Sequence, residues 1–153
     1  MNFNSLSPGE KLIFACGVIL LILSFMPWFR LGATALPLVE RTAWSNLVSA
    51  LGVIAGILMV LQILLSRFGT AKLPTPKLPW GQVHLILGVF ALVMILAQAL
   101  IGDTYSIPSL GGAQIDLERR PSLILGTLAA FGLAYGGFVR SKEPEGAGGG
   151  GYI

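Results

Sequence analysis

Four long stretches of apolar residues alternate along this chain with short polar segments. The stretches run over residues 12–29, 47–65, 82–101 and 122–139, and hardly any ionisable side chain interrupts them. Each has about the 17–25 residues that a helix needs to cross roughly 30 Å of hydrocarbon. Inside hydrocarbon, only helices and closed barrels satisfy their backbone polar groups. The pattern therefore predicts an all-α integral membrane protein, built as a bundle of four transmembrane helices.

The spacing of small residues predicts where these helices pack. Helices in lipid associate through close contact between small side chains, because lipid removes the hydrophobic drive for association. The second and fourth stretches carry glycines at helical spacing. They are Gly52 and Gly56 in the second stretch, and Gly126, Gly132 and Gly136 in the fourth. We expect them to form smooth packing faces, either within the bundle or against another subunit.

The connections between the stretches differ in charge. Residues 66–80 hold three basic side chains and no acidic one, which is typical of a short cytoplasmic loop. The other two connections mix acidic side chains with arginines. This asymmetry predicts that both termini are cytoplasmic and that the two mixed loops face outward. The expected location is the bacterial cytoplasmic (inner) membrane, with several passes.

The two outer loops alternate apolar and polar residues, which indicates short strands. In the second loop, Gly111 and Gly112 suit a tight turn between strands at 106–110 and 113–117. We therefore expect a small extracytoplasmic β cap over the bundle. Both loops also run from a Leu-Gly pair to a Glu-Arg pair. Duplication of a helical hairpin would explain this shared pattern, and chance is the competing explanation.

Residues 1–140 form one transmembrane domain in this interpretation, and residues 141–153 form a cytoplasmic tail. The tail is so rich in glycine that ordering it would cost more backbone entropy than its contacts could offset, which predicts flexibility. Pro74, Pro76 and Pro79 make the cytoplasmic loop a stiff, extended spacer, with a docking peptide as the alternative.

The three tryptophans lie at the boundaries of the stretches. Aromatic residues are enriched at both faces of a membrane, where their rings sit among the headgroups. We therefore interpret Trp28, Trp44 and Trp80 as membrane-interface anchors. The first two are expected at the outer face and Trp80 at the inner face.

Composition restricts the chemistry that the chain can carry. Only 11% of its residues are charged, and the net charge of +3 reflects basic residues beside the membrane stretches rather than a nucleic-acid site. Cys16 is the single cysteine, which excludes an intrachain disulfide and a multi-cysteine metal site. The sequence contains no phosphate-binding loop and no recognisable nucleophile with its base. We predict no enzymatic activity, no metal and no cofactor, with the lipid bilayer and other membrane subunits as partners.

His84 is the only histidine and the one candidate for cofactor binding. A single histidine can supply one axial bond to haem or to a chlorophyll-type pigment. The favoured alternative is an interfacial histidine whose polar tip lies among the lipid headgroups.

A short aromatic motif and the glycine-rich fourth stretch support a resemblance. Phe25, Met26, Pro27, Trp28 and Phe29 close the first stretch, and Trp44 precedes the second. In these features the chain resembles small four-span membrane proteins of bacteria, actinobacteria-like ones especially. The resemblance covers most of the chain. It implies the fold and the membrane location and assigns no activity to any residue.

These observations favour a non-enzymatic accessory subunit that packs within a larger membrane assembly. A small transporter or channel component is the first alternative, and it would need a water-filled path lined by Gln62, Gln98 and the outer serines. A pigment- or haem-binding subunit acting through His84 is the second alternative.

Overall fold

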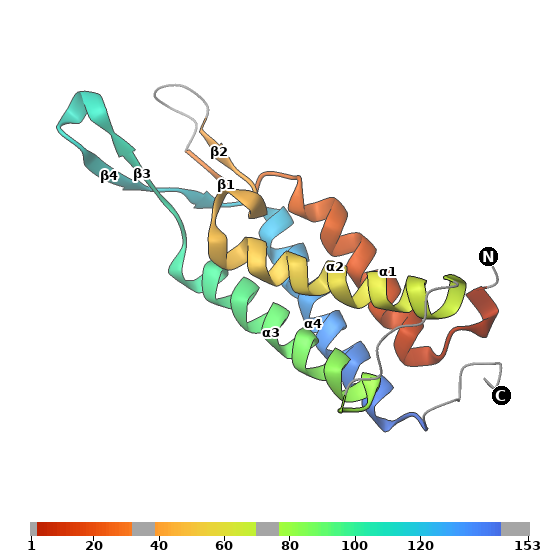
Figure 1. Cartoon of the computed structure of the whole chain (residues 1–153). Helices are drawn as coiled ribbons and strands as arrows, with labels where there is room; N and C mark the ends of the chain where they lie inside the picture. The colour runs from red at the N-terminus through yellow and green to blue at the C-terminus, as the bar shows by residue number, and fades with distance from the viewer. Residues whose placement is uncertain (1–2, 32–38, 70–76, 145–153) are drawn as a thin grey trace.

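The computed structural model describes residues 3–31, 39–69 and 77–144, and within these ranges the chain is mostly helical. Four α-helices form the body of the molecule, and successive helices run in opposite directions (Figure 1). They are α1 (Pro8–Ser24), α2 (Leu47–Phe68), α3 (Trp80–Ile101) and α4 (Pro121–Lys142).

The helices form a ring in chain order. Helix α4 packs extensively against both α3 and α1, whereas α2 packs against α3 and α1 and barely touches α4. Each helix therefore neighbours the next one along the chain, and the last closes the ring with the first. This is the up-and-down arrangement that short connections favour.

Short antiparallel strands gather at one end of the bundle, which we call the sheet end (Figure 1). A three-stranded sheet has the order β2–β1–β5, with Phe29 of β1 opposite both Arg41 and Arg119. A separate two-stranded ribbon pairs β3 with β4. The strands are β1 (Phe29–Arg30), β2 (Glu40–Arg41), β3 (Thr104–Ile107), β4 (Ala113–Asp116) and β5 (Glu118–Arg119).

The ribbon confirms the expected strand pair in the second outer loop, with one difference. Pro108–Leu110 forms a single 3-10 turn instead of extending the first strand. Gly111 and Gly112 follow it with φ values of 66° and 84°, a backbone region that glycine enters without steric cost. The reversal is therefore longer than the two-residue turn that the glycine pair predicted.

Helix α1 begins and ends earlier than the apolar stretch at 12–29 predicted. Ser7 caps it in a reciprocal box: the Ser7 hydroxyl accepts from the Glu10 N–H at 3.3 Å, and the Glu10 carboxylate accepts from the Ser7 N–H at 3.0 Å. Pro8 occupies the first turn, where a missing N–H costs nothing. Ser24 is the last helical residue, three positions before Pro27, whose ring would clash with a continuing helix.

Among the residues that the structure describes, three helices are long and apolar enough to cross a membrane by length and composition. Helices α2, α3 and α4 each contain 22 residues, and they make the chain an integral, multi-pass membrane protein. Helix α1 has 17 residues. At about 1.5 Å per residue it is some 25 Å long, slightly less than the hydrocarbon thickness. Helix α1 therefore accounts for only part of the predicted span at 12–29, and its crossing of the membrane stays a prediction.

Most of the interior of the bundle is apolar, and so is much of its outside. Ile13, Met59, Ile95 and Leu133 come one from each helix and are completely buried where the helices meet. Large apolar side chains also cover the outward faces, including Ile22, Leu58, Val93 and Phe131, each about half exposed or more. A surface of this kind suits contact with lipid tails.

Three predicted features fall outside the described residues, in whole or in part. Residues 32–38 of the first outer loop, residues 70–76 of the proline-rich loop and residues 145–153 of the tail are not described. The tail prediction began at residue 141, whereas α4 continues to Lys142. The duplication of a helical hairpin stays a prediction.

Candidate functional site

The ribbon β3–β4 projects beyond the helices at the sheet end (Figure 1). All four residues of β4 are exposed, and Leu110 at the tip is 62% exposed. The root of the ribbon is fixed, because Leu117 beside it is buried and the Leu117 N–H donates to the Asp103 carbonyl at 2.9 Å. The ribbon therefore has a fixed base and an apolar residue at its tip. The outer edge of each strand has no neighbouring strand among the described residues.

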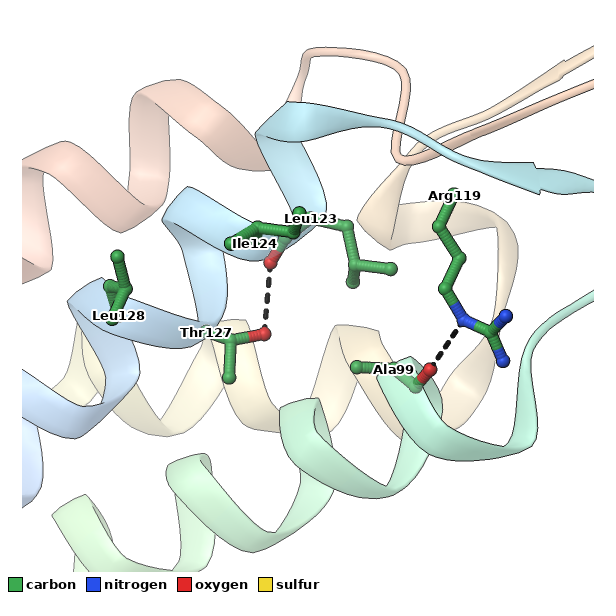
Figure 2. Close-up of a pocket in the computed structure, with 6 residues that line it drawn as sticks. All are labelled: Ala99, Arg119, Leu123, Ile124, Thr127 and Leu128. Carbon is green, nitrogen blue, oxygen red and sulfur yellow. Dashed lines mark hydrogen bonds between the residues drawn. The ribbon is translucent and has the colours of Figure 1, made fainter.

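A hollow of about 220 Å³ lies beside the root of the ribbon (Figure 2). Its walls are mainly aliphatic, and the one charged side chain, Arg119, lies at its edge. The lining residues are Ala99 of α3, Arg119 of β5, and Leu123, Ile124, Thr127 and Leu128 of α4. The Thr127 hydroxyl donates to the Leu123 carbonyl at 2.9 Å, so its polar atom is satisfied within α4.

Arg119 is held in place by the end of α3. Its Nε donates to the Ala99 carbonyl at 2.7 Å, and its Nη2 donates to the Leu100 carbonyl at 3.1 Å. Carbonyls in the last turn of a helix lack intrahelical partners, so the guanidinium caps α3. Gly102 follows with a φ of 82°, and a Cβ there would lie 3.3 Å from Nη2. The end of α3, the glycine and the β5 strand together fix this cation.

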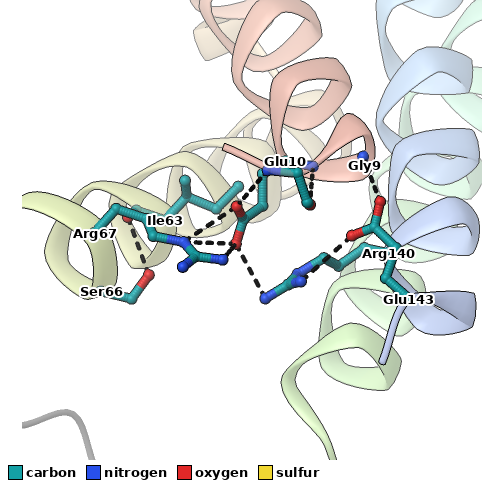
Figure 3. Close-up of polar contacts among 8 residues, drawn as sticks. Gly9, Glu10, Ile63, Ser66, Arg67, Arg140 and Glu143 are labelled. Carbon is teal, nitrogen blue, oxygen red and sulfur yellow. Dashed lines mark hydrogen bonds and ion pairs between the residues drawn. The ribbon is translucent and has the colours of Figure 1, made fainter. Parts of the chain in front are cut away.

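The opposite end of the bundle contains a buried ionic cluster (Figure 3). We call it the Glu10 cluster, after the carboxylate at its centre, whose residue is only 1% exposed. Arg67 of α2 approaches the Glu10 Oε1 with its Nη2 at 2.8 Å, and Arg140 of α4 approaches the same oxygen with its Nη2 at 3.0 Å. One carboxylate of α1 therefore fastens α2 and α4.

Glu143 completes the Glu10 cluster. Its carboxylate accepts from the Gly9 N–H at 2.9 Å and from Arg140 Nη1 at 3.3 Å. Burial alone would raise the pKa of Glu143, but hydrogen bonds from Ser7, Gly9 and Arg140 together lower it below its ordinary value. Two acids and two arginines then balance in charge. This arrangement holds the helices together, because each carboxylate already accepts hydrogen bonds from donors within the protein.

The sequence reading missed the Glu10 cluster, although one local signal was present. Glu10 lies just before the first apolar stretch, so it did not count as a charge within the membrane region. Its arginine partners are far away in sequence, 57 residues in the case of Arg67. The available signal was the Ser7-to-Glu10 spacing, which is a capping-box pattern and marks a helix start.

His84 is buried between helices, which corrects the expectation of a polar tip among headgroups. The residue is 1% exposed, and neither ring nitrogen has a hydrogen-bond partner among the described residues. Its ring lies 6.4 Å from that of Trp80, centroid to centroid. Helix α4 covers it closely, since a Cβ at Gly137 would lie 2.6 Å from the His84 carbonyl oxygen. The nitrogens are not accessible for axial ligation in this arrangement, and cofactor binding stays a prediction.

At each of the five predicted packing glycines, an added Cβ would contact a residue from another element of the same chain. Their closest neighbours are Ile95 for Gly52, Leu133 for Gly56, the Trp28 ring for Gly126, Cys16 for Gly132 and Ile13 for Gly136. These glycines therefore bring all four helices, and the segment after α1, into contact.

The tightest helix contact involves glycines that the sequence reading did not select. Gly81 and Gly88 of α3 and Gly137 of α4 would each place a Cβ within 2.9 Å of the backbone of the facing helix. The signal for α3 was the seven-residue spacing, which His84 and Ala91 extend into a heptad pattern of buried positions. Backbone contact of this kind explains why the α3–α4 interface is so extensive.

The three tryptophans differ in environment. Trp28 is completely buried, and its Nε1 donates to the Leu23 carbonyl at 2.8 Å, which differs from the expected interfacial position. Trp44, at the same end, is 39% exposed, and its ring lies 5.9 Å from that of Phe25. Trp80 is half-buried at the other end. Trp28 is buried because Gly126 leaves room for its ring against α4.

Three buried polar side chains of the helices donate hydrogen bonds to nearby backbone carbonyls. Ser24 donates to the Leu21 carbonyl at 2.7 Å, and Ser49 donates to the Ala43 carbonyl at 2.6 Å. The Gln98 amide donates to the Gly102 carbonyl at 2.8 Å. These groups stabilise helix ends rather than facing a common channel.

Neither metal ligands nor known relatives add to this picture. In the ranges that the structure covers, no three His, Cys, Asp or Glu side chains gather as a metal site. Comparisons with protein-family models, with curated proteins and with solved structures gave no match.

Proposed function

We propose that this protein is a non-enzymatic accessory subunit of a larger assembly in the bacterial inner membrane, and that it binds its partner through the sheet end. The projecting ribbon carries this proposal. Leu110 is 62% exposed and Ile115 is 39% exposed on a ribbon whose root is fixed. Each strand of a two-stranded ribbon also has one unpaired edge, which is a template for pairing with another chain.

The proposed topology has both termini in the cytoplasm and the ribbon outside. Lys11, Arg67 and Arg140 all lie at the Glu10 end, in agreement with an excess of basic residues on the cytoplasmic side. Helix α1 packs along α4 and would cross the membrane with it. The extended residues after Ser24 add the length that the helix lacks.

The bundle itself supports a role in packing. The charges of the Glu10 cluster balance one another, and the buried Ser24, Ser49 and Gln98 donate to backbone carbonyls. A transport path would instead need polar groups that face a shared cavity. The geometry therefore favours a rigid support for the ribbon over a conduit.

Co-purification from native membranes tests the proposal. The double variant Leu110→Ser with Ile115→Ser removes the apolar side chains of the ribbon without touching the bundle. Partner subunits recovered with the wild type in mild detergent should be lost from this variant. The matched control is Ser109→Ala with Gln114→Ala, which alters exposed polar residues of the same ribbon and should retain the partner.

Two results would count against the accessory role at the ribbon. One is a wild-type protein that purifies only as a monomer after cross-linking in intact membranes. The other is a partner that binds the double variant and the control equally well.

A further inference from the structure

We propose that the hollow between α3 and α4 at the sheet end binds an anionic phospholipid, with an acyl chain in the hollow and the phosphate on Arg119. This site is separate from the ribbon, and it does not depend on the proposed accessory role. The occupant is inferred from the chemistry of the walls and from the cation at the edge (Figure 2).

The walls of the hollow match an acyl chain. Leu123 is 1% exposed and forms the inner wall, whereas Ile124 and Leu128 are 60% and 62% exposed and form the outer rim. On the α3 side the lining residue is Ala99, whose small side chain leaves room for a ligand. An apolar wall that opens between exposed side chains faces the lipid, and about 220 Å³ accommodates part of one chain.

Arg119 supplies charge complementarity at the mouth. Its bonds to the Ala99 and Leu100 carbonyls use only part of the guanidinium, which carries several N–H donors in a planar fork. The remaining donors have no protein partner among the described residues, and the side chain is exposed. A phosphate accepts paired hydrogen bonds from such a fork, and the anchoring means that little side-chain freedom is lost on binding.

Arg119 and the hollow also lie at the depths in the membrane that a phosphate and an acyl chain would occupy. Arg119 lies beside the last turn of α3 and just before the first turn of α4, where the membrane helices meet the headgroup region. From Leu123 to Leu128 the hollow follows α4 inward for about 7 Å, at 1.5 Å per residue. One phospholipid molecule can therefore place its phosphate at the mouth and its chain along α4.

Lipid competition in nanodiscs tests the site. The protein is reconstituted with phosphatidylglycerol or with phosphatidylcholine of identical chains, and retained lipid is counted by native mass spectrometry. The wild type should retain phosphatidylglycerol several-fold better, because phosphatidylcholine has the same phosphate but adds the positive charge of choline beside Arg119. Arg119→Gln should abolish the preference, whereas the neighbouring charge loss Arg120→Gln should leave most of it.

A second pair of variants tests the hollow. Leu128→Trp fills it and should reduce retention of both lipids several-fold, whereas Leu125→Trp, on an exposed part of α4 outside the lining, should not. Equal effects within either pair would overturn the proposal, as would the absence of any lipid preference. If Arg119→Gln fails to fold, the Leu128 and Leu125 variants decide the matter. A photoreactive group at position 128 that labels another protein instead of lipid in native membranes would also overturn it.

Discussion

The Glu10 cluster and Arg119, at opposite ends of this bundle, hold their charges in opposite ways. At the Glu10 end, carboxylates and arginines neutralise each other inside the protein, and Glu10 itself is 1% exposed. At the sheet end, within the part of the chain that the structure describes, Arg119 donates only to backbone carbonyls and stays exposed. A buried, satisfied ion cluster fixes geometry, because its groups have no remaining partner to bind. An anchored but unneutralised cation can still bind an anion. The difference agrees with the proposals made above, in which the Glu10 end fastens the helices and the sheet end binds a partner and a lipid.

The largest effect is expected from breaking the fastening end. Glu10→Gln removes the shared negative charge and leaves Arg67 and Arg140 mostly buried beside each other. We expect a loss of about 3 kcal/mol in the free energy of unfolding, the lower part of the range for a broken buried pair, because both arginines retain some exposure. Unfolding by SDS titration in mixed micelles measures it.

The control for this prediction is Glu118→Gln, which removes an exposed carboxylate at the sheet end and should change stability by less than about 0.5 kcal/mol. If the two variants unfold at the same SDS fraction, the Glu10 cluster does not fasten the helices.

A smaller effect is expected from the glycine contact between α3 and α4. Gly137→Ala places a methyl group 2.6 Å from the His84 carbonyl oxygen, and a backbone atom cannot move aside as a side chain can. The α3–α4 interface should open at a cost of about 2 kcal/mol. Gly132→Ala, which meets the Cys16 side chain, should cost less. Thermal midpoints from circular dichroism in detergent rank the two, and the reverse order would contradict the backbone contact.

At the recognition end, Gly102→Ala should cost about 1–2 kcal/mol and displace Arg119. The backbone at Gly102, with φ 82° and ψ −165°, belongs to a region that is essentially restricted to glycine. The variant should therefore also lose its preference for phosphatidylglycerol. Gly111→Asn is the comparison, because φ 66° and ψ 23° is the left-handed region that asparagine tolerates. Unchanged lipid preference in Gly102→Ala would show that this glycine does not position Arg119.

The smallest effect is a pH dependence at the fastening end. The folded pKa of Glu143 lies below its ordinary value of 4.5, so its carboxylate stabilises the folded state above that pH. The stabilisation should disappear as the pH falls through the lower folded pKa. Melting curves of the wild type and Glu143→Gln should therefore differ at pH 6 and converge toward pH 3. A gap that stays constant with pH would assign the effect to packing.

The membrane bundle could be predicted from the sequence because hydropathy is a local property of consecutive residues. The same holds for the ribbon, where alternation and the Gly111–Gly112 pair marked two strands and their reversal. The turn at Pro108 lengthened that reversal, which shows the limit of reading a turn from its glycines alone.

The side-chain contacts at the two ends of the bundle could not be predicted in the same way, because they join residues that are distant in the chain. Glu10 meets Arg67 and Arg140 only when three helices are side by side. Trp28 reads as an interfacial residue until Gly126 is placed opposite its ring. His84 reads as a headgroup contact until α4 covers it. In each case a second helix determines the environment, and hydropathy along one segment contains no information about that helix.

The position of Glu10 near the start of the chain also imposes an order on biosynthesis. Its first partner, Arg67, follows 57 residues later, and Glu143 lies 134 residues after Gly9. At about 5–20 residues per second, the ribosome completes the second contact roughly 7–27 s after it makes Gly9. During that interval an inserted α1 can pair its carboxylate only with α2. Closure of the ring thus follows the synthesis of α4, and a chain that stops before α4 leaves Glu10 with one arginine instead of two.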